Sequence, residues 1–67
     1  MTKICVIGAG YVGMSLSVLL AVKNEVTVLE INNERVKLIN ERKSPITDKE
    51  ISEYLATKQL NLKATDN

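Results

Sequence analysis

The residues of this chain with the clearest chemical potential are three glycines, Gly8, Gly10 and Gly13, in the pattern Gly-x-Gly-x-x-Gly. Gly8 is expected to make a sharp turn with a positive φ, which glycine adopts without a steric penalty. Gly10 allows the main chain to approach a diphosphate, and Gly13 allows a helix to press against the preceding strand. The N–H groups of Tyr11, Val12 and Gly13 would lack helical partners, so we expect them to bind the phosphates.

An acidic residue, Glu30, ends the next apolar run, 22 positions after Gly8. A carboxylate there is expected to accept hydrogen bonds from both hydroxyls of an adenosine ribose and to repel a 2′-phosphate, which favours NAD over NADP. Arg35 leaves two interpretations open, because its guanidinium could pack over the adenosine or pair with a 2′-phosphate. Together with Glu30, the glycines predict a dinucleotide site rather than a plain connection between a strand and a helix.

The hydrophobic pattern predicts the elements that position these residues. Residues 3–7 form an apolar run typical of a buried parallel strand, and residues 11–22 form a long apolar stretch typical of a helix. Residues 25–30 are rich in β-branched side chains and predict a second strand. Residues 60–64 alternate between apolar and polar side chains, which predicts a third, half-buried strand.

Two further helices are predicted between the second and third strands. Asn32 is expected to cap the first of them, on which Arg42 is among the residues expected to face water. Thr47 and Glu50 have the spacing of a capping box and predict the start of the second. Cys5, in the first strand, is predicted to be a small buried apolar residue without a catalytic role.

The order of these elements, β-α-β-α-α-β, predicts an α/β fold in which residues 1–67 form the N-terminal part of a dinucleotide-binding domain. Three parallel strands in the order 3-2-1 would make the first half of a Rossmann-type doubly wound sheet. The first strand would then have an unpaired edge. We therefore expect the isolated chain to be marginally stable or to associate through that edge.

Composition limits the other classes of function. The chain has 67 residues, a net charge of +1 and a single cysteine, which indicates one small domain without a disulfide framework or a zinc cluster. Its charges are spread along the sequence, so we expect no nucleic-acid partner and no membrane surface as partner. The longest apolar stretch is too short to span a bilayer, and no signal peptide is expected, which favours a cytoplasmic location.

Residues beyond the glycine motif carry a resemblance to a known family. The chain resembles the N-terminal segment of the UDP-glucose/GDP-mannose dehydrogenase family along nearly all of its length. In the turn after the second helix it looks more like the bacterial UDP-glucose branch. The matching residues are Gly8-Ala9-Gly10-Tyr11-Val12-Gly13, Glu30-Ile31, Arg35-Val36, Ile39-Asn40, Ser44-Pro45-Ile46, Asp48, Ile51, Tyr54-Leu55 and Leu60-Asn61-Leu62-Lys63-Ala64-Thr65.

This resemblance implies that NAD is the cofactor and that the parent protein is an enzyme. Such an enzyme would oxidise UDP-glucose to UDP-glucuronate with two NAD, as a homo-oligomer, through a cysteine and other catalytic residues that lie further along the family's sequence. None of these catalytic residues falls within residues 1–67, so the chain alone is expected to be inactive. Glu30 stands where the family usually has aspartate, and Arg35 where it often has a basic residue near the adenosine.

Two alternatives from the sequence remain. The first is another nucleotide-sugar dehydrogenase, acting on GDP-mannose or UDP-N-acetylmannosamine. The second is a non-catalytic regulatory domain that senses NAD or ATP. A sensor of that kind is expected to return quickly to its third strand, whereas residues 44–58 here insert a proline turn and an extra capped helix. That insertion favours the dehydrogenase.

Overall fold

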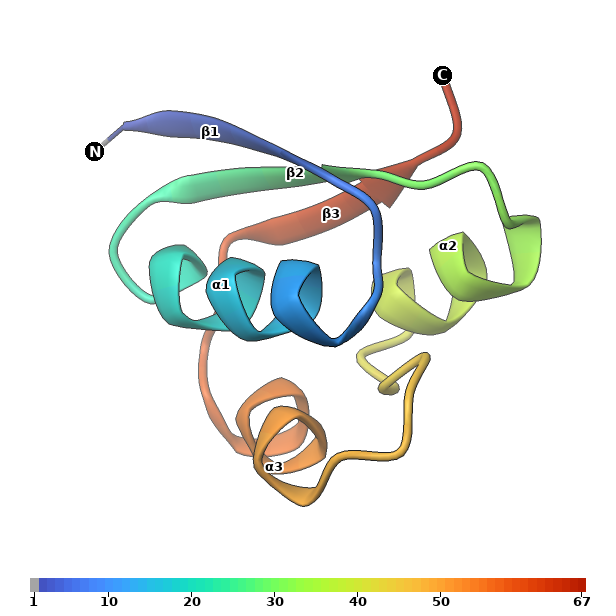
Figure 1. The fold of residues 1–67 in the computed structure, drawn as a ribbon. Helices are drawn as coiled ribbons and strands as arrows, with labels where there is room; N and C mark the ends of the chain where they lie inside the picture. The colour runs from blue at the N-terminus through green and yellow to red at the C-terminus, as the bar shows by residue number, and fades with distance from the viewer. Residues whose placement is uncertain (1) are drawn as a thin grey trace.

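A parallel three-stranded sheet carries three helices on one of its faces (Figure 1). The computed structural model describes residues 2–67. The strands lie in the order β1-β2-β3, which confirms the predicted order 3-2-1. In chain order the elements are β1 (Lys3–Ile7), α1 (Tyr11–Ala21), β2 (Glu25–Leu29), α2 (Asn33–Asn40), α3 (Lys49–Thr57) and β3 (Leu62–Thr65).

The register of the strands lines up apolar side chains toward the helices. One row across the sheet consists of Ile4, Val26 and Leu62, and the next consists of Val6, Val28 and Ala64. Because side chains alternate along a strand, both rows lie on the same face. These side chains join Met14 and Val18 of α1, Ile39 of α2, and Ile51 and Leu55 of α3 in a single aliphatic core.

Cys5 lies on the opposite face of the sheet, and the prediction that it is buried is wrong. Its row continues through Thr27 and Lys63, neither of which is buried. Successive right-handed crossovers that move in the same direction along a sheet place their helices on the same face. All three helices therefore cover one face, and the odd-numbered side chains of β1 point away from them.

Of the two helix starts predicted from capping residues, that of α2 is confirmed and that of α3 is wrong by one residue. Asn32 does cap α2, since its side-chain oxygen accepts hydrogen bonds from the N–H groups of Glu34 at 3.0 Å and Arg35 at 3.2 Å. The capping box at Thr47 is wrong, because α3 begins one residue later. Asp48 is its N-cap and accepts from the N–H of Ile51 at 2.9 Å. Aspartate is a stronger N-cap than threonine.

The outer edge of β3 is covered by side chains from the end of α2. Asn40 pairs with Ala64 in both directions, donating to its carbonyl at 3.0 Å and accepting from its N–H at 2.9 Å. Arg42 donates to the carbonyl of Leu62 at 2.8 Å, so the prediction that Arg42 faces water is wrong. Arg42 has a φ of 63°, the left-handed conformation common just after a helix end, where the N–H groups of Arg42 and Lys43 bond to the carbonyls of Ile39 and Leu38.

Within residues 2–67, no helix has both the length and the apolar character that crossing a membrane requires.

Candidate dinucleotide site

Gly8 makes the turn that leads from β1 into the candidate site. Its φ is +91°, which confirms the predicted positive φ and is a conformation that side chains with a Cβ rarely adopt. Its N–H donates to the carbonyl of Leu29 at 2.8 Å, which ties the turn to the end of β2. The glycine turn and the end of β2 therefore lie side by side at the carboxyl edge of the sheet, where ligands of open α/β sheets bind.

Gly13 and Gly10 meet the two other requirements of the motif. A Cβ added to Gly13 would overlap the carbonyl oxygen of Gly8 and lie 3.6 Å from Val6 Cγ1, which confirms that α1 packs closely on β1 at this residue. A Cβ added to Gly10 would meet no heavy atom within 4 Å. The space beside Gly10 is therefore open, and any side chain there would project into it.

Three main-chain N–H groups at the start of α1 have no acceptor among the described residues. The first hydrogen bond of the helix runs from the N–H of Met14 to the carbonyl of Gly10 at 2.9 Å. The N–H groups of Tyr11, Val12 and Gly13 precede it in the first turn. The helix dipole favours negative charge at this end, and the turn contains no acidic side chain that would compete with an anion.

Glu30 comes directly after β2 and is 7% exposed. One carboxylate oxygen, Oε1, accepts from the N–H of Ala9 at 2.7 Å, and the other, Oε2, accepts from the N–H of Asn32 at 2.9 Å. These two hydrogen bonds, that from Asn32 first, lower the pKa of Glu30 although burial opposes the shift, and the nearby Arg35 lowers it further. Glu30 is therefore ionised and fastened to the glycine turn.

The contact between Glu30 and Ala9 was not foreseen from the sequence. Ala9 is completely buried between two glycines, and its small size is the only sequence signal for this role. Each carboxylate oxygen can accept more than one hydrogen bond, so ribose hydroxyls can still be bound at Glu30. Glu30 thus fastens the turn and keeps acceptor capacity at the place expected for the ribose.

Arg35 lies beside Glu30 without forming a close ion pair. Its Nη1 is 3.9 Å from Oε1 of Glu30, and its side chain is 41% exposed. An exposed guanidinium at this position is free to pack on an adenosine or to meet a 2′-phosphate. Both interpretations of Arg35 therefore stay open.

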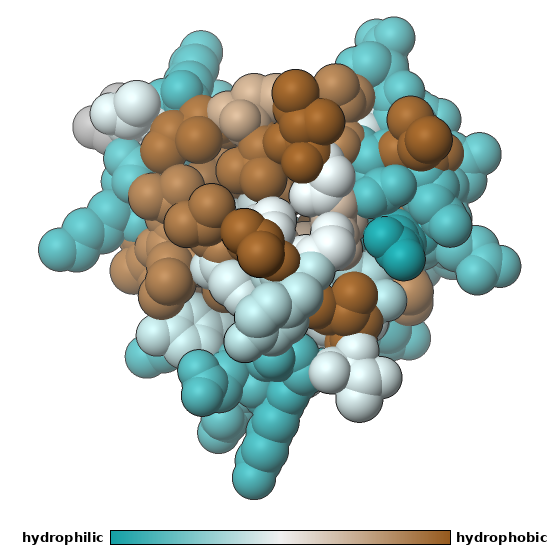
Figure 2. All heavy atoms as spheres, in the orientation of Figure 1, coloured by the Kyte–Doolittle hydropathy of each residue, from teal (hydrophilic) through white to brown (hydrophobic). Residues whose placement is uncertain are grey.

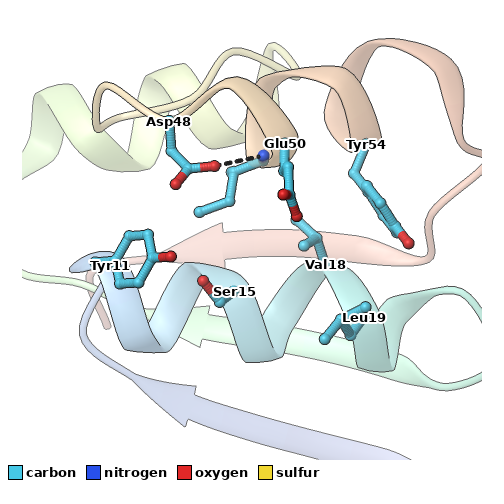
Figure 3. A pocket seen from close by; sticks show the side chains of 8 residues that line it. Tyr11, Ser15, Val18, Leu19, Asp48, Glu50 and Tyr54 are labelled. Carbon is cyan, nitrogen blue, oxygen red and sulfur yellow. Dashed lines mark hydrogen bonds between the residues drawn. The ribbon is translucent and has the colours of Figure 1, made fainter.

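The side chain of Tyr11 points away from the glycine turn. It lines a pocket of about 90 Å³ between α1 and α3, together with Ser15 and Leu19 of α1 and Asp48 and Tyr54 near α3 (Figure 3). This volume is far below the roughly 300 Å³ of a typical small ligand site, so a dinucleotide does not fit there. Tyr11 and Val12, whose side chains are exposed, would serve a cofactor through their main-chain N–H groups.

Comparison with known protein families gives a match over nearly the whole chain. Residues 2–67 match the model described as the NAD-binding domain of the UDP-glucose/GDP-mannose dehydrogenase family. The chain belongs to the UDP-glucose/GDP-mannose dehydrogenase family. This family is one of dehydrogenases, and the domain that the chain represents takes NAD as its cofactor.

Individual relatives agree with membership of this family. The chain is 52% identical over 63 residues to UDP-glucose 6-dehydrogenase of Streptococcus pneumoniae, covering 94% of this chain and 16% of that protein. It is 39% identical over 67 residues to UDP-glucose 6-dehydrogenase of Campylobacter jejuni, covering 97% of this chain and 17% of that protein. The chain thus spans about one sixth of the length of these curated relatives.

A solved structure supports the fold. The chain is similar, with a TM-score of 0.80 and 27% identity, to a ternary complex of GDP-mannose dehydrogenase from Pseudomonas aeruginosa, covering 98% of this chain and 15% of that one. The open space beside Gly10 and the bare N–H groups after it fit the diphosphate of the family's NAD. Residues 2–67 contain no group of three or more histidine, cysteine, aspartate or glutamate side chains that could hold a metal ion.

Proposed function

We propose that this chain binds the adenosine and diphosphate of NAD in an enzyme that oxidises UDP-glucose to UDP-glucuronate. The observation that carries the binding site is the row of unpartnered N–H groups at residues 11–13 beside the open space at Gly10. Glu30 supplies the acceptors for the adenosine ribose. Its charge disfavours a 2′-phosphate and so selects NAD over NADP.

The relatives named above support UDP-glucose as the substrate. Both curated relatives carry the name UDP-glucose 6-dehydrogenase, and one of them matches the chain at 52% identity. The proposed oxidation removes two hydrides from the sugar and transfers each to one NAD. The role of residues 11–13 and Glu30 is to hold the cofactor so that its nicotinamide is presented to the sugar.

A titration of the chain with NAD and NADP tests the site. We expect NAD to bind more tightly than NADP. Glu30→Ala should weaken the binding of NAD at least tenfold and reduce the ratio of the affinities for NAD and NADP. Gly10→Val should abolish binding, because its side chain would occupy the space of the diphosphate. Glu34→Ala, which removes an exposed carboxylate on α2, is the matched control. An unchanged preference in Glu30→Ala would refute the role of this carboxylate.

GDP-mannose is a second candidate substrate, because the similar solved structure is a GDP-mannose dehydrogenase. The two candidates are distinguished by supplying UDP-glucose or GDP-mannose to a full-length protein that contains this chain. The proposal requires NADH to form with UDP-glucose, in a ratio of two NADH per sugar, and not with GDP-mannose.

A further inference from the structure

Asn32 connects the end of β2 to the start of α2 by hydrogen bonds. Its N–H donates to Oε2 of Glu30 at 2.9 Å, and its side-chain Oδ1 accepts from the N–H groups of Glu34 at 3.0 Å and Arg35 at 3.2 Å. Glu30 and Arg35, the two residues expected at the adenosine, are thus bonded to the same residue. We propose that Asn32 is a positioning residue for the adenosine ribose of NAD, which acts by holding the carboxylate of Glu30. This inference rests on the proposed function.

Both sets of hydrogen bonds depend on one backbone conformation. Asn32 has a φ of −80° and a ψ of 110°, which is the extended conformation of a residue that caps the N-terminus of a helix. The side-chain bonds to α2 favour this conformation, because Oδ1 reaches the N–H groups of the first turn only from an extended residue. The N–H that donates to Glu30 belongs to the same residue, so the cap also holds this donor in place.

The first turn of α2 has little packing that could replace the cap. No residue of the turn 33–36 is fully buried, and the buried residue of this helix is Ile39, near its other end. Hydrophilic side chains gather over α2, whereas hydrophobic ones gather over β1 and α1 (Figure 2). Helices shorter than roughly 12 residues are marginal in water without such packing. Loss of the cap would therefore loosen the first turn together with residue 32.

The orientation of the Glu30 carboxylate is set at both of its oxygens. Oε1 accepts from the N–H of Ala9 at 2.7 Å, and Oε2 accepts from the N–H of Asn32. Because Glu30 is only 7% exposed, this orientation decides whether its free lone pairs face the ribose hydroxyls. The N–H of Asn32 is also the first cause of the lowered pKa of Glu30, which agrees with a close contact to the charged oxygen. A carboxylate that kept only the bond from Ala9 could rotate away from the ribose.

Binding of two nucleotides to Asn32→Ala, in a full-length protein that contains this chain, tests the proposal. The nucleotides are NAD and its analogue whose adenosine lacks the 2′-hydroxyl. We expect the native protein to bind NAD about tenfold more tightly than the analogue, because the analogue loses a hydrogen bond to a charged carboxylate. Asn32→Ala should bring this ratio below about threefold. A variant that was merely less stable would lose affinity for both nucleotides alike and keep the native ratio.

Two further variants complete the experiment. Asn32→Ser keeps a capping side chain and should keep the native ratio of affinities. Asn33→Ala is the matched control, because Asn33 is exposed and its side chain makes no hydrogen bond among the described residues. A native ratio in Asn32→Ala, or an equal loss in Asn32→Ser, would overturn the positioning role and leave Glu30 as the ribose acceptor. Equal binding of both nucleotides by the native protein would overturn the contact between Glu30 and the 2′-hydroxyl, and the role of Asn32 with it.

Discussion

The side chain of Glu30 does more than its position in the sequence indicates. The apolar pattern predicts Glu30 as the last residue of the second strand, where its carboxylate is expected to face a ribose. In the structure it directly follows β2. Its hydrogen bonds to the N–H groups of Ala9 and Asn32 do not follow from the sequence pattern. The bond from Ala9 joins residues 21 positions apart and depends on how the glycine turn folds back, and the bond from Asn32 is made within the local bend after β2. Nearly every residue type has a main-chain N–H group, so the sequence does not show which of these groups will bond to the Glu30 carboxylate.

The lowered pKa of Glu30 predicts how stability depends on pH. The folded chain holds this proton less tightly than the unfolded chain, so Glu30 stabilises the fold above the ordinary glutamate pKa of about 4.3. The contribution is lost as the pH falls through the lower pKa of the folded state. At neutral pH, Glu30→Gln should lower the free energy of unfolding by about 1.5–3 kcal/mol, because the neutral amide cannot accept both hydrogen bonds that the carboxylate accepts.

Urea unfolding at several pH values measures this loss. The difference between the native chain and Glu30→Gln should be constant near neutrality and shrink in acid, while the control Glu34→Gln should stay close to the native chain throughout. A difference that does not change with pH would contradict the link to ionisation.

Single elements were predicted well where the apolar pattern is long and less well at their ends. The span of β1 and the start of α1 agree with the sequence pattern, because strand, glycine turn and helix follow one another without competing signals. The start of α3 was misplaced, because Thr47 and Asp48 are both capping residues and local spacing favoured the wrong one. The exposure of Arg42 could not be judged from its own helix, because its partners beyond α2 are the carbonyls of Leu60 and Leu62, 18 and 20 positions further along the chain, just before and at the start of β3.

The cap of α3 can be tested with a pair of neighbouring variants. Asp48→Ala should lower the free energy of unfolding by about 1 kcal/mol, since the N–H of Ile51 loses its acceptor. Thr47→Ala removes the residue named by the sequence pattern and should change stability by less than about 0.5 kcal/mol. Urea denaturation of the two variants shows which residue caps α3. A larger loss of stability in Thr47→Ala than in Asp48→Ala would identify Thr47 as the N-cap.

The molecule as a whole has one covered face and one bare face of its sheet. The sequence of β1 could not reveal this, because Ile4, Cys5, Val6 and Ile7 are all apolar and alternate between the two faces. The fold class and strand order could be predicted from the order of elements alone. The handedness of the crossovers also dictates that the helices gather on one side, which leaves Cys5 exposed although its neighbours in the sequence are apolar.

The bare face predicts that the Cys5 thiol reacts without unfolding. We expect a soluble disulfide reagent to modify the native chain at a rate within about tenfold of the urea-unfolded chain, since Cys5 is exposed. The release of the reagent's chromophore measures both rates at the same pH. A rate of modification several orders of magnitude lower in the native chain than in the unfolded chain would show that Cys5 is buried.

The side chains of Asn40 and Arg42 on β3 have a consequence for solubility. They occupy the hydrogen-bonding groups of Ala64 and Leu62 at the far margin of the sheet. An edge strand whose main-chain groups are unpaired is a template on which a strand of another molecule can pair, and natural proteins cover such edges. Because Asn40 and Arg42 already occupy these groups, we expect a strand of another molecule to find no free partners at Leu62 and Ala64.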